Sequence, residues 1–151
     1  MIISFCGPSK LYGSENLEEK LLAFLNEVIT DERTNFYLRD SGAFDAFAYN
    51  ACKRYQVIHS NVRLTFVTPY ITEQYCEKLI PKLREKYDMI VYPEIEDKPL
   101  RLALLHRNQW MIKVADVVVT HVDRHSGGLY RLYMNAKKNG KKVFNLSNMK
   151  L

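Results

Sequence analysis

The chain has 151 residues, the length of one domain, and its 47% hydrophobic and 26% charged residues are typical of ordinary soluble globular proteins. No apolar run approaches the roughly 20 residues that cross a membrane, and residues 1–7 lack the charged leader of a signal peptide, so we expect one cytoplasmic domain over residues 1–151. The net charge of +5 permits nucleic acid as a partner, but the basic residues are spread out except for one lysine cluster at 137–142.

The first part of the chain alternates between strand and helix patterns. Ile2 to Cys6 predicts a first strand that ends in Gly7-Pro8-Ser9, and a helix from about Asn16 to Ile29 follows, with leucines on one face. Phe36 to Leu38 predicts a short second strand, and Ala46 to Tyr55 has the spacing of a packed helix. These segments indicate two successive strand–helix units.

The middle of the chain continues the alternation. Val62 to Val67 predicts a strand, and Thr72 to Tyr87 predicts a helix that Pro81 should kink or split. Met89 to Tyr92 predicts a short fourth strand, and Pro99 to Val114 predicts another helix.

The last third reads as strand, glycine turn, helix and strand. Val117-Val118-Val119 is apolar and β-branched, as in a strand buried on both faces, and the final strand ends near Leu146. Strands that alternate with helices through short connections predict an α/β fold with a doubly wound, mostly parallel Rossmann-like sheet and helices on both faces. In such sheets ligands bind beyond the C-terminal ends of the strands.

The turn of Ser126, Gly127 and Gly128 lies directly before a predicted helix. Unpaired N–H groups and the positive end of a helix dipole favour a phosphate or carboxylate at such a turn. Gly7 and Ser9 form a weaker version of the same arrangement after the first strand. A plain strand-to-helix turn also fits both segments.

The chemistry of metals and disulfides has little support in this sequence. Cys6, Cys52 and Cys76 are widely spaced and form no CxxC pair, so we expect reduced, mostly buried thiols. His121 and His125 are four residues apart, but His121 lies near a strand end and no third ligand is evident. We therefore expect neither a metal nor a cofactor.

Several segments together carry a family resemblance. They are Phe5-Cys6-Gly7-Pro8-Ser9, Ser41-Gly42-Ala43-Phe44-Asp45, Arg107-Asn108, Ala115 to Val119, Ser126-Gly127-Gly128, and Ala136 to Leu146. In this order they resemble the SLOG superfamily of Rossmann-like proteins, in particular its small stand-alone bacterial members. The superfamily also includes the Lonely Guy phosphoribohydrolases and a DNA-processing protein. The resemblance implies a nucleotide-type ligand over the glycine turns, and it suggests dimers or higher assemblies.

One departure from the family bears on catalysis. The hydrolase branch has Pro-Gly-Gly-x-Gly-Thr-x-x-Glu, whereas residues 127–132 of this chain are Gly-Gly-Leu-Tyr-Arg-Leu. The threonine and the glutamate of the hydrolase motif are absent, so the resemblance supports nucleotide binding by this chain more strongly than it supports hydrolysis. The turn at residues 40–43 is also poorer in glycine than is usual in the family.

Four further residues are candidates for the site. The resemblance aligns Arg107 as a phosphate clamp and includes Gly42 in the phosphate-binding set, although Arg107 also fits a surface position on an amphipathic helix. Asp45 suits contact with a sugar or carboxylate catalysis, and equally an N-cap. Asp123 is the other catalytic candidate, in a loop whose charges solvent alone could also explain.

The sequence therefore favours a protein that binds a nucleotide or nucleotide-derived small molecule, as a sensor does. Two alternatives remain open. One is an N-glycosidic hydrolase or transferase acting on nucleotides, in which a carboxylate stabilises an oxocarbenium-like centre or activates water. The other is a single-strand nucleic-acid binding protein, whose affinity should fall steeply with salt.

Overall fold

A computed structural model describes residues 1–12, 16–30 and 32–151. In this part of the chain, strands and helices alternate. The strands are β1 (Ile2–Phe5), β2 (Thr34–Leu38), β3 (Val62–Val67), β4 (Met89–Val91), β5 (Val117–Thr120) and β6 (Lys142–Asn145). The helices are α1 (Leu17–Val28), α2 (Ala43–Ile58), α3 (Glu73–Lys86), α4 (Ala103–Val114) and α5 (Gly128–Lys138), with a short 3₁₀ helix at Leu100–Leu102.

The six strands form one parallel sheet in the order β4-β3-β2-β1-β5-β6. The chain builds the sheet outward from β1 to β4 and then returns to place β5 on the other side of β1, with Phe5 opposite Val119. The predicted doubly wound, Rossmann-like α/β fold is confirmed. The order of the strands reverses between β1 and β5, which is where such sheets bind ligands.

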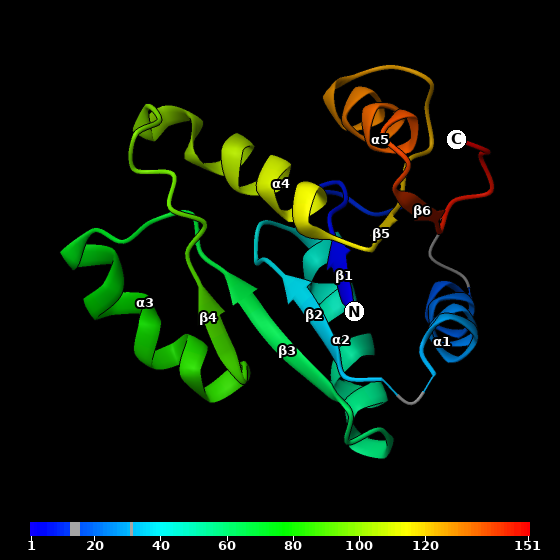
Figure 1. Ribbon diagram of the computed structural model, residues 1–151, viewed down its shortest axis with the longest axis horizontal. Coiled ribbons are helices and arrows are strands. Elements are labelled where there is room, and N and C mark those ends of the chain that lie inside the picture. The colour runs from blue at the N-terminus through cyan, green and yellow to red at the C-terminus, as the bar shows by residue number, and fades with distance from the viewer. Residues whose placement is uncertain (13–15, 31) are drawn as a thin grey trace.

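Helices cover both faces of the sheet, with α4 and α5 on one face and α1, α2 and α3 on the other (Figure 1). The larger core lies on the face of the three helices, where Phe5 meets Phe36 edge to face at 5.5 Å between ring centroids. Met111 and Tyr133 anchor the core on the opposite face. Both faces of β5 are therefore buried, as its continuous run of valines predicts.

Two helices differ from the sequence expectation. The helix expected over Ala46 to Tyr55 begins at Ala43 and ends at Ile58, since the preceding turn leads straight into it. Pro81 was expected to kink or split its helix, and the split does not occur, because α3 is one helix from Glu73 to Lys86. Pro81 is exposed, so water can satisfy the carbonyl that loses its helical partner.

The described residues include no helix that combines the length and the apolar character needed to span a bilayer. The three cysteines are free thiols, of which Cys6 and Cys52 are buried and Cys76 is partly exposed. The expectation of mostly buried thiols is confirmed.

Candidate functional site

A cavity of about 460 Å³ opens at the C-terminal edge of the sheet, where β1 and β5 part. Its lining comes from the loops that follow these two strands and from the first turn of α5. The lining residues are Pro8, Ser9, Lys10, Tyr12, His121, Val122, Asp123, Arg124, Ser126, Gly127, Gly128, Leu129 and Tyr130. The structure thus brings Ser9, Ser126, Gly127, Gly128 and Asp123 of the sequence-derived set together in one site.

The N-terminus of α5 forms one wall of this cavity. Gly127 precedes the helix with φ 95°, a left-handed conformation that favours glycine, and its carbonyl accepts the first helical hydrogen bond from Arg131. The N–H groups of the first helical turn have no partner within the helix. They and the helix dipole therefore give this wall a positive potential.

The glycines at the strand ends differ in what surrounds them. A Cβ atom at Gly7 would lie 2.3 Å from the Phe44 ring, and one at Gly42 would lie 2.7 Å from the Cα atom of Ser9. Tight packing of the β1 loop against the start of α2 therefore explains both glycines. A Cβ at Gly128 meets nothing within 4 Å, so packing within the described structure does not demand a glycine there. Open space beside a helix N-terminus leaves room for a ligand to approach the backbone.

The charged side chains of the lining are mostly positive. Lys10 and Arg124 contribute cations, while Asp123 contributes the single carboxylate among the described lining residues. Asp123 lies 3.8 Å from the guanidinium of Arg124, and both side chains are more than half exposed. Such an exposed pair is loose, so a ligand can displace it at little cost. Together with α5, these charges favour an anionic ligand.

His121 is a lining residue that the sequence reasoning did not place in the ligand site. It directly follows β5 and is 6% exposed. Its imidazole forms no hydrogen bond with any residue that the structure describes, whereas Asp45, Arg107 and Tyr133 at this edge of the sheet are paired. The buried hydroxyl of Thr120, directly before His121, also has no partner among the described residues. A signal was present in the sequence, because the first polar residue after a buried parallel strand lies at the ligand-binding edge.

Asp45 lies outside this cavity. Its Oδ1 accepts a hydrogen bond of 2.9 Å from Arg39 Nε, and its Oδ2 accepts one of 2.6 Å from the Ser41 N–H. Both oxygens therefore serve the β2–α2 turn, and the carboxylate is 2% exposed. Asp45 and Gly42 line a separate hollow of about 380 Å³, so the sugar-binding role predicted for Asp45 would require a different part of the edge.

Arg107 also lies away from the cavity, in the protein interior. It is 1% exposed, and its guanidinium donates to the carbonyl of Val67, to Ser41 Oγ and to the side chain of Asn108. Burial and the nearby charge of Arg39 lower the pKa of Arg107. The surface position that the sequence also allowed is therefore wrong. Arg107 is not among the residues that line this cavity, and its role as a phosphate clamp stays a prediction.

The buried thiol at the end of β1 is not available as a nucleophile. Burial raises the pKa of the Cys6 thiol despite the opposing effect of Arg39, so the reactive thiolate is disfavoured. The backbone carbonyl of Cys6 accepts a hydrogen bond from the hydroxyl group of Tyr133, and this bond connects the end of β1 to α5. Of the two catalytic candidates from the sequence, Asp123 alone borders the cavity.

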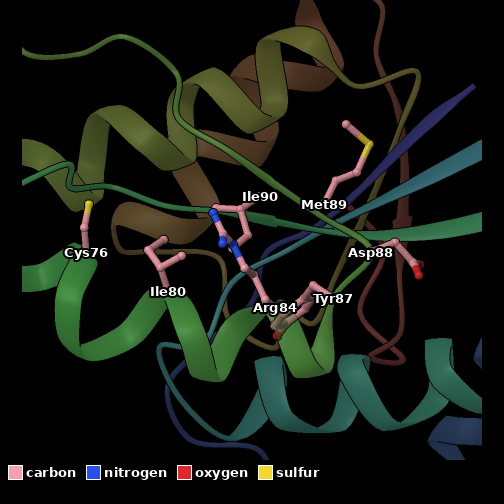
Figure 2. A pocket seen from close by; sticks show the side chains of 7 residues that line it. All are labelled: Cys76, Ile80, Arg84, Tyr87, Asp88, Met89 and Ile90. Carbon is pink, nitrogen blue, oxygen red and sulfur yellow. The ribbon is translucent and has the colours of Figure 1, made fainter.

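Two other surface features are less suited to a nucleotide. A groove of about 600 Å³ lies between α3 and the edge strand β4, where Ile80 and Ile90 form apolar walls and Arg84 extends from α3 (Figure 2). The lysine cluster at 137–142 lies at the other end of α5, and Lys141 there donates to the carbonyls of Lys113 and Ala115. Neither feature is continuous with the cavity at the strand ends.

No group of three or more His, Cys, Asp or Glu side chains with the geometry of a metal site occurs within the described ranges. Comparison of the chain with the known protein families gave no match, and no curated protein sequence matches it either.

Proposed function

We propose that this protein binds a nucleotide or nucleotide-derived small molecule in the cavity between β1 and β5, with a phosphate at the N-terminus of α5. The observation that carries the proposal is the open approach to Gly128, beside unpaired N–H groups and within a cavity at the switch point of the sheet. The volume of about 460 Å³ falls in the usual range for small-molecule sites.

The groups around Gly128 suit a phosphate. Ser9 and Ser126 offer hydroxyl groups, and Lys10 offers an ammonium group. Each well-aligned charge-assisted hydrogen bond contributes roughly 1.5–3 kcal/mol to binding, so a few of them account for micromolar affinity.

The aromatic lining suits the remainder of a nucleotide. Tyr12 is 65% exposed and borders the cavity, as does Tyr130, whose ring lies edge to face with His125 at 5.7 Å between ring centroids. An exposed tyrosine next to a phosphate site offers a face on which a base stacks.

A thermal-shift titration tests this proposal. The purified protein is titrated with nucleoside mono-, di- and cyclic phosphates and with ADP-ribose, in parallel with a Gly128→Asp variant. A ligand at about 100 times its Kd stabilises the fold by about 2.7 kcal/mol, which raises Tm by several degrees. The variant should fold, because an acidic residue suits the first turn of a helix and meets no steric obstacle, but its carboxylate should repel and displace the phosphate.

The matched control is Gln74→Glu, which adds the same charge to the exposed first turn of α3. We expect a shift in the parent and in this control and none in folded Gly128→Asp. Equal shifts in all three proteins would place the ligand elsewhere, and the absence of a shift with every compound would reject the proposal.

A second candidate is cleavage of an N-glycosidic bond, and the position of Asp123 at the cavity favours it. A carboxylate there could stabilise the oxocarbenium-like centre or activate water. Long incubation of the pure protein with nucleoside monophosphates should then release free base, and Asp123→Asn should abolish the release. If no base forms, the protein is a binding protein and not a hydrolase.

A further inference from the structure

His121 is the most buried of the four histidines, and its ring has no hydrogen-bond partner among the described residues. His59 Nδ1 lies 2.9 Å from the carbonyl oxygen of Tyr55, and His106 Nδ1 lies 3.2 Å from Gln109 Oε1. His121 is more buried than either, yet neither of its ring nitrogens bonds to a described residue. The fully enclosed side-chain atoms without a partner in the described structure are the hydroxyl oxygens of Thr65 and Thr120, and the ring nitrogens of His121 are not among them, so the ring keeps some opening toward the cavity.

A molecule bound in the cavity is one source of a partner for His121. The residue borders the cavity, so a bound molecule reaches the imidazole without any rearrangement of the sheet. His125 is exposed on the same loop, where water satisfies its ring. His121 is enclosed on its other sides, so the cavity is the direction from which its ring can be reached.

The surroundings of His121 indicate which part of the ligand it meets. The loop from His121 to Gly127 begins at this histidine and ends at the start of α5, and both ends border the cavity. Among the described lining residues, Lys10 and Arg124 outweigh the single carboxylate of Asp123. An imidazole has an N–H donor in either neutral tautomer and in its protonated form. A donor in a positive cavity matches an anionic oxygen better than a sugar hydroxyl.

We infer that His121 donates a hydrogen bond to the phosphate of the bound ligand, and that the site therefore selects phosphate esters over the corresponding nucleosides. This inference rests on the proposed function and deepens it, since it assigns the chemical group that the site recognises. It adds a side-chain donor from the end of β5 to the backbone donors of α5.

The direct test is NMR of the histidine ring nitrogens in the ¹⁵N-labelled parent protein. The probes are inorganic phosphate and the 5′-monophosphates of adenosine, guanosine, cytidine and uridine, each compared with its own nucleoside. We expect the phosphate compounds to shift the His121 ring signals while the nucleosides do not. His59 and His106, which have protein partners, serve as internal controls.

Variants give the second measurement. His121→Ala should weaken binding of the best monophosphate by roughly 10- to 100-fold, the loss expected for one charge-assisted hydrogen bond, and leave the weak affinity for its nucleoside unchanged. His121→Gln, which retains an N–H donor, should recover part of the loss. The matched control His125→Ala should stay within about twofold of the parent.

The outcomes separate this inference from the proposed function. If a monophosphate binds in a Gly128-dependent manner but leaves the His121 signals and affinity unchanged, the inference is overturned and the function stands. Signals that shift with the nucleosides as well would assign His121 to the sugar or base and overturn the phosphate contact. A shift with inorganic phosphate but with no nucleotide would keep His121 as a phosphate contact, but it would overturn the selection of phosphate esters and reject the nucleotide. If no probe shifts the His121 signals and none binds, both the inference and the proposed function are overturned.

Discussion

Three charged side chains, Arg39, Asp45 and Arg107, lie buried beneath the C-terminal ends of the strands. Arg39 pairs with Asp45 and also donates to the carbonyl of Gly7, while Arg107 has no carboxylate within ion-pair distance among the described residues. The two guanidinium groups bond the carbonyls at the ends of β1 and β3, where parallel strands leave acceptors unpaired. Through these bonds they support the edge of the sheet from below, and together with Asp45 they leave one net positive charge there.

Replacement of Arg107 measures this role. Arg107→Met should lower the free energy of unfolding by about 2–3 kcal/mol, because the carbonyl of Val67 and the hydroxyl of Ser41 lose their buried donor. Urea denaturation measures the change, and Arg101→Met on the exposed 3₁₀ helix should change stability by less than about 0.5 kcal/mol. Equal stability of the two variants, combined with loss of nucleotide binding in Arg107→Met, would restore the role predicted from the sequence.

At the scale of elements, α3 is the α-helix with the fewest buried residues in the described structure. Leu83 is its one buried residue, and Pro81 interrupts its hydrogen bonds in the middle. The helix persists because its apolar side chains pack on the sheet beside the edge strand β4. Tertiary packing thus outweighs the local preference of a proline to end a helix.

This balance predicts that Pro81→Ala stabilises the protein. Alanine restores the N–H that donates to the carbonyl of Glu77, and Pro81 is exposed, so the fold should gain about 1–3 kcal/mol. Urea denaturation of Pro81→Ala beside Lys82→Ala, an exposed neighbour expected to change little, measures the effect. A loss of stability in Pro81→Ala would show that the proline shapes α3 to fit the sheet.

At the scale of the whole molecule, burial of ionisable groups sets the stability at alkaline pH. Burial raises the pKa of the Cys52 thiol well above 9.0 and that of the Tyr133 hydroxyl well above 10.0. Below the unfolded values the groups are protonated in both states, and their contribution to stability is fully present. As the pH rises above these values, the two groups ionise in the unfolded chain but stay protonated in the folded protein. The free energy of unfolding therefore falls until the pH reaches the raised pKa values of the folded protein.

We therefore expect the free energy of unfolding to fall above about pH 9, by up to about 1.4 kcal/mol per pH unit for each such group. Urea midpoints between pH 7 and 10.5 measure the slope. Cys52→Ala should show a shallower slope, whereas Val62→Ala, which removes core volume without a titratable group, should keep that of the parent. An unchanged slope in Cys52→Ala would show that this thiol does not contribute.

Local patterns were sufficient to predict the sheet and its helices. Val62–Val67 has the bounds expected from its apolar pattern, and the valines of β5 indicated burial on both faces, because strand and helix periodicity acts over a few neighbouring residues. The glycine turn before α5 was predictable for the same reason. These features also fix the edge of the sheet at which a ligand is expected.

What the sequence by itself determined was therefore the parallel fold and the edge where function lies. Only the tertiary structure decided which side chains face the cavity. Arg107 and Asp45 are taken into the interior by contacts with Val67 and Arg39, whereas His121 lines the same cavity as Gly128 and has no hydrogen-bond partner among the described residues. The physical reason is that hydrogen bonding and burial depend on residues far apart in the chain, whose convergence no local pattern encodes.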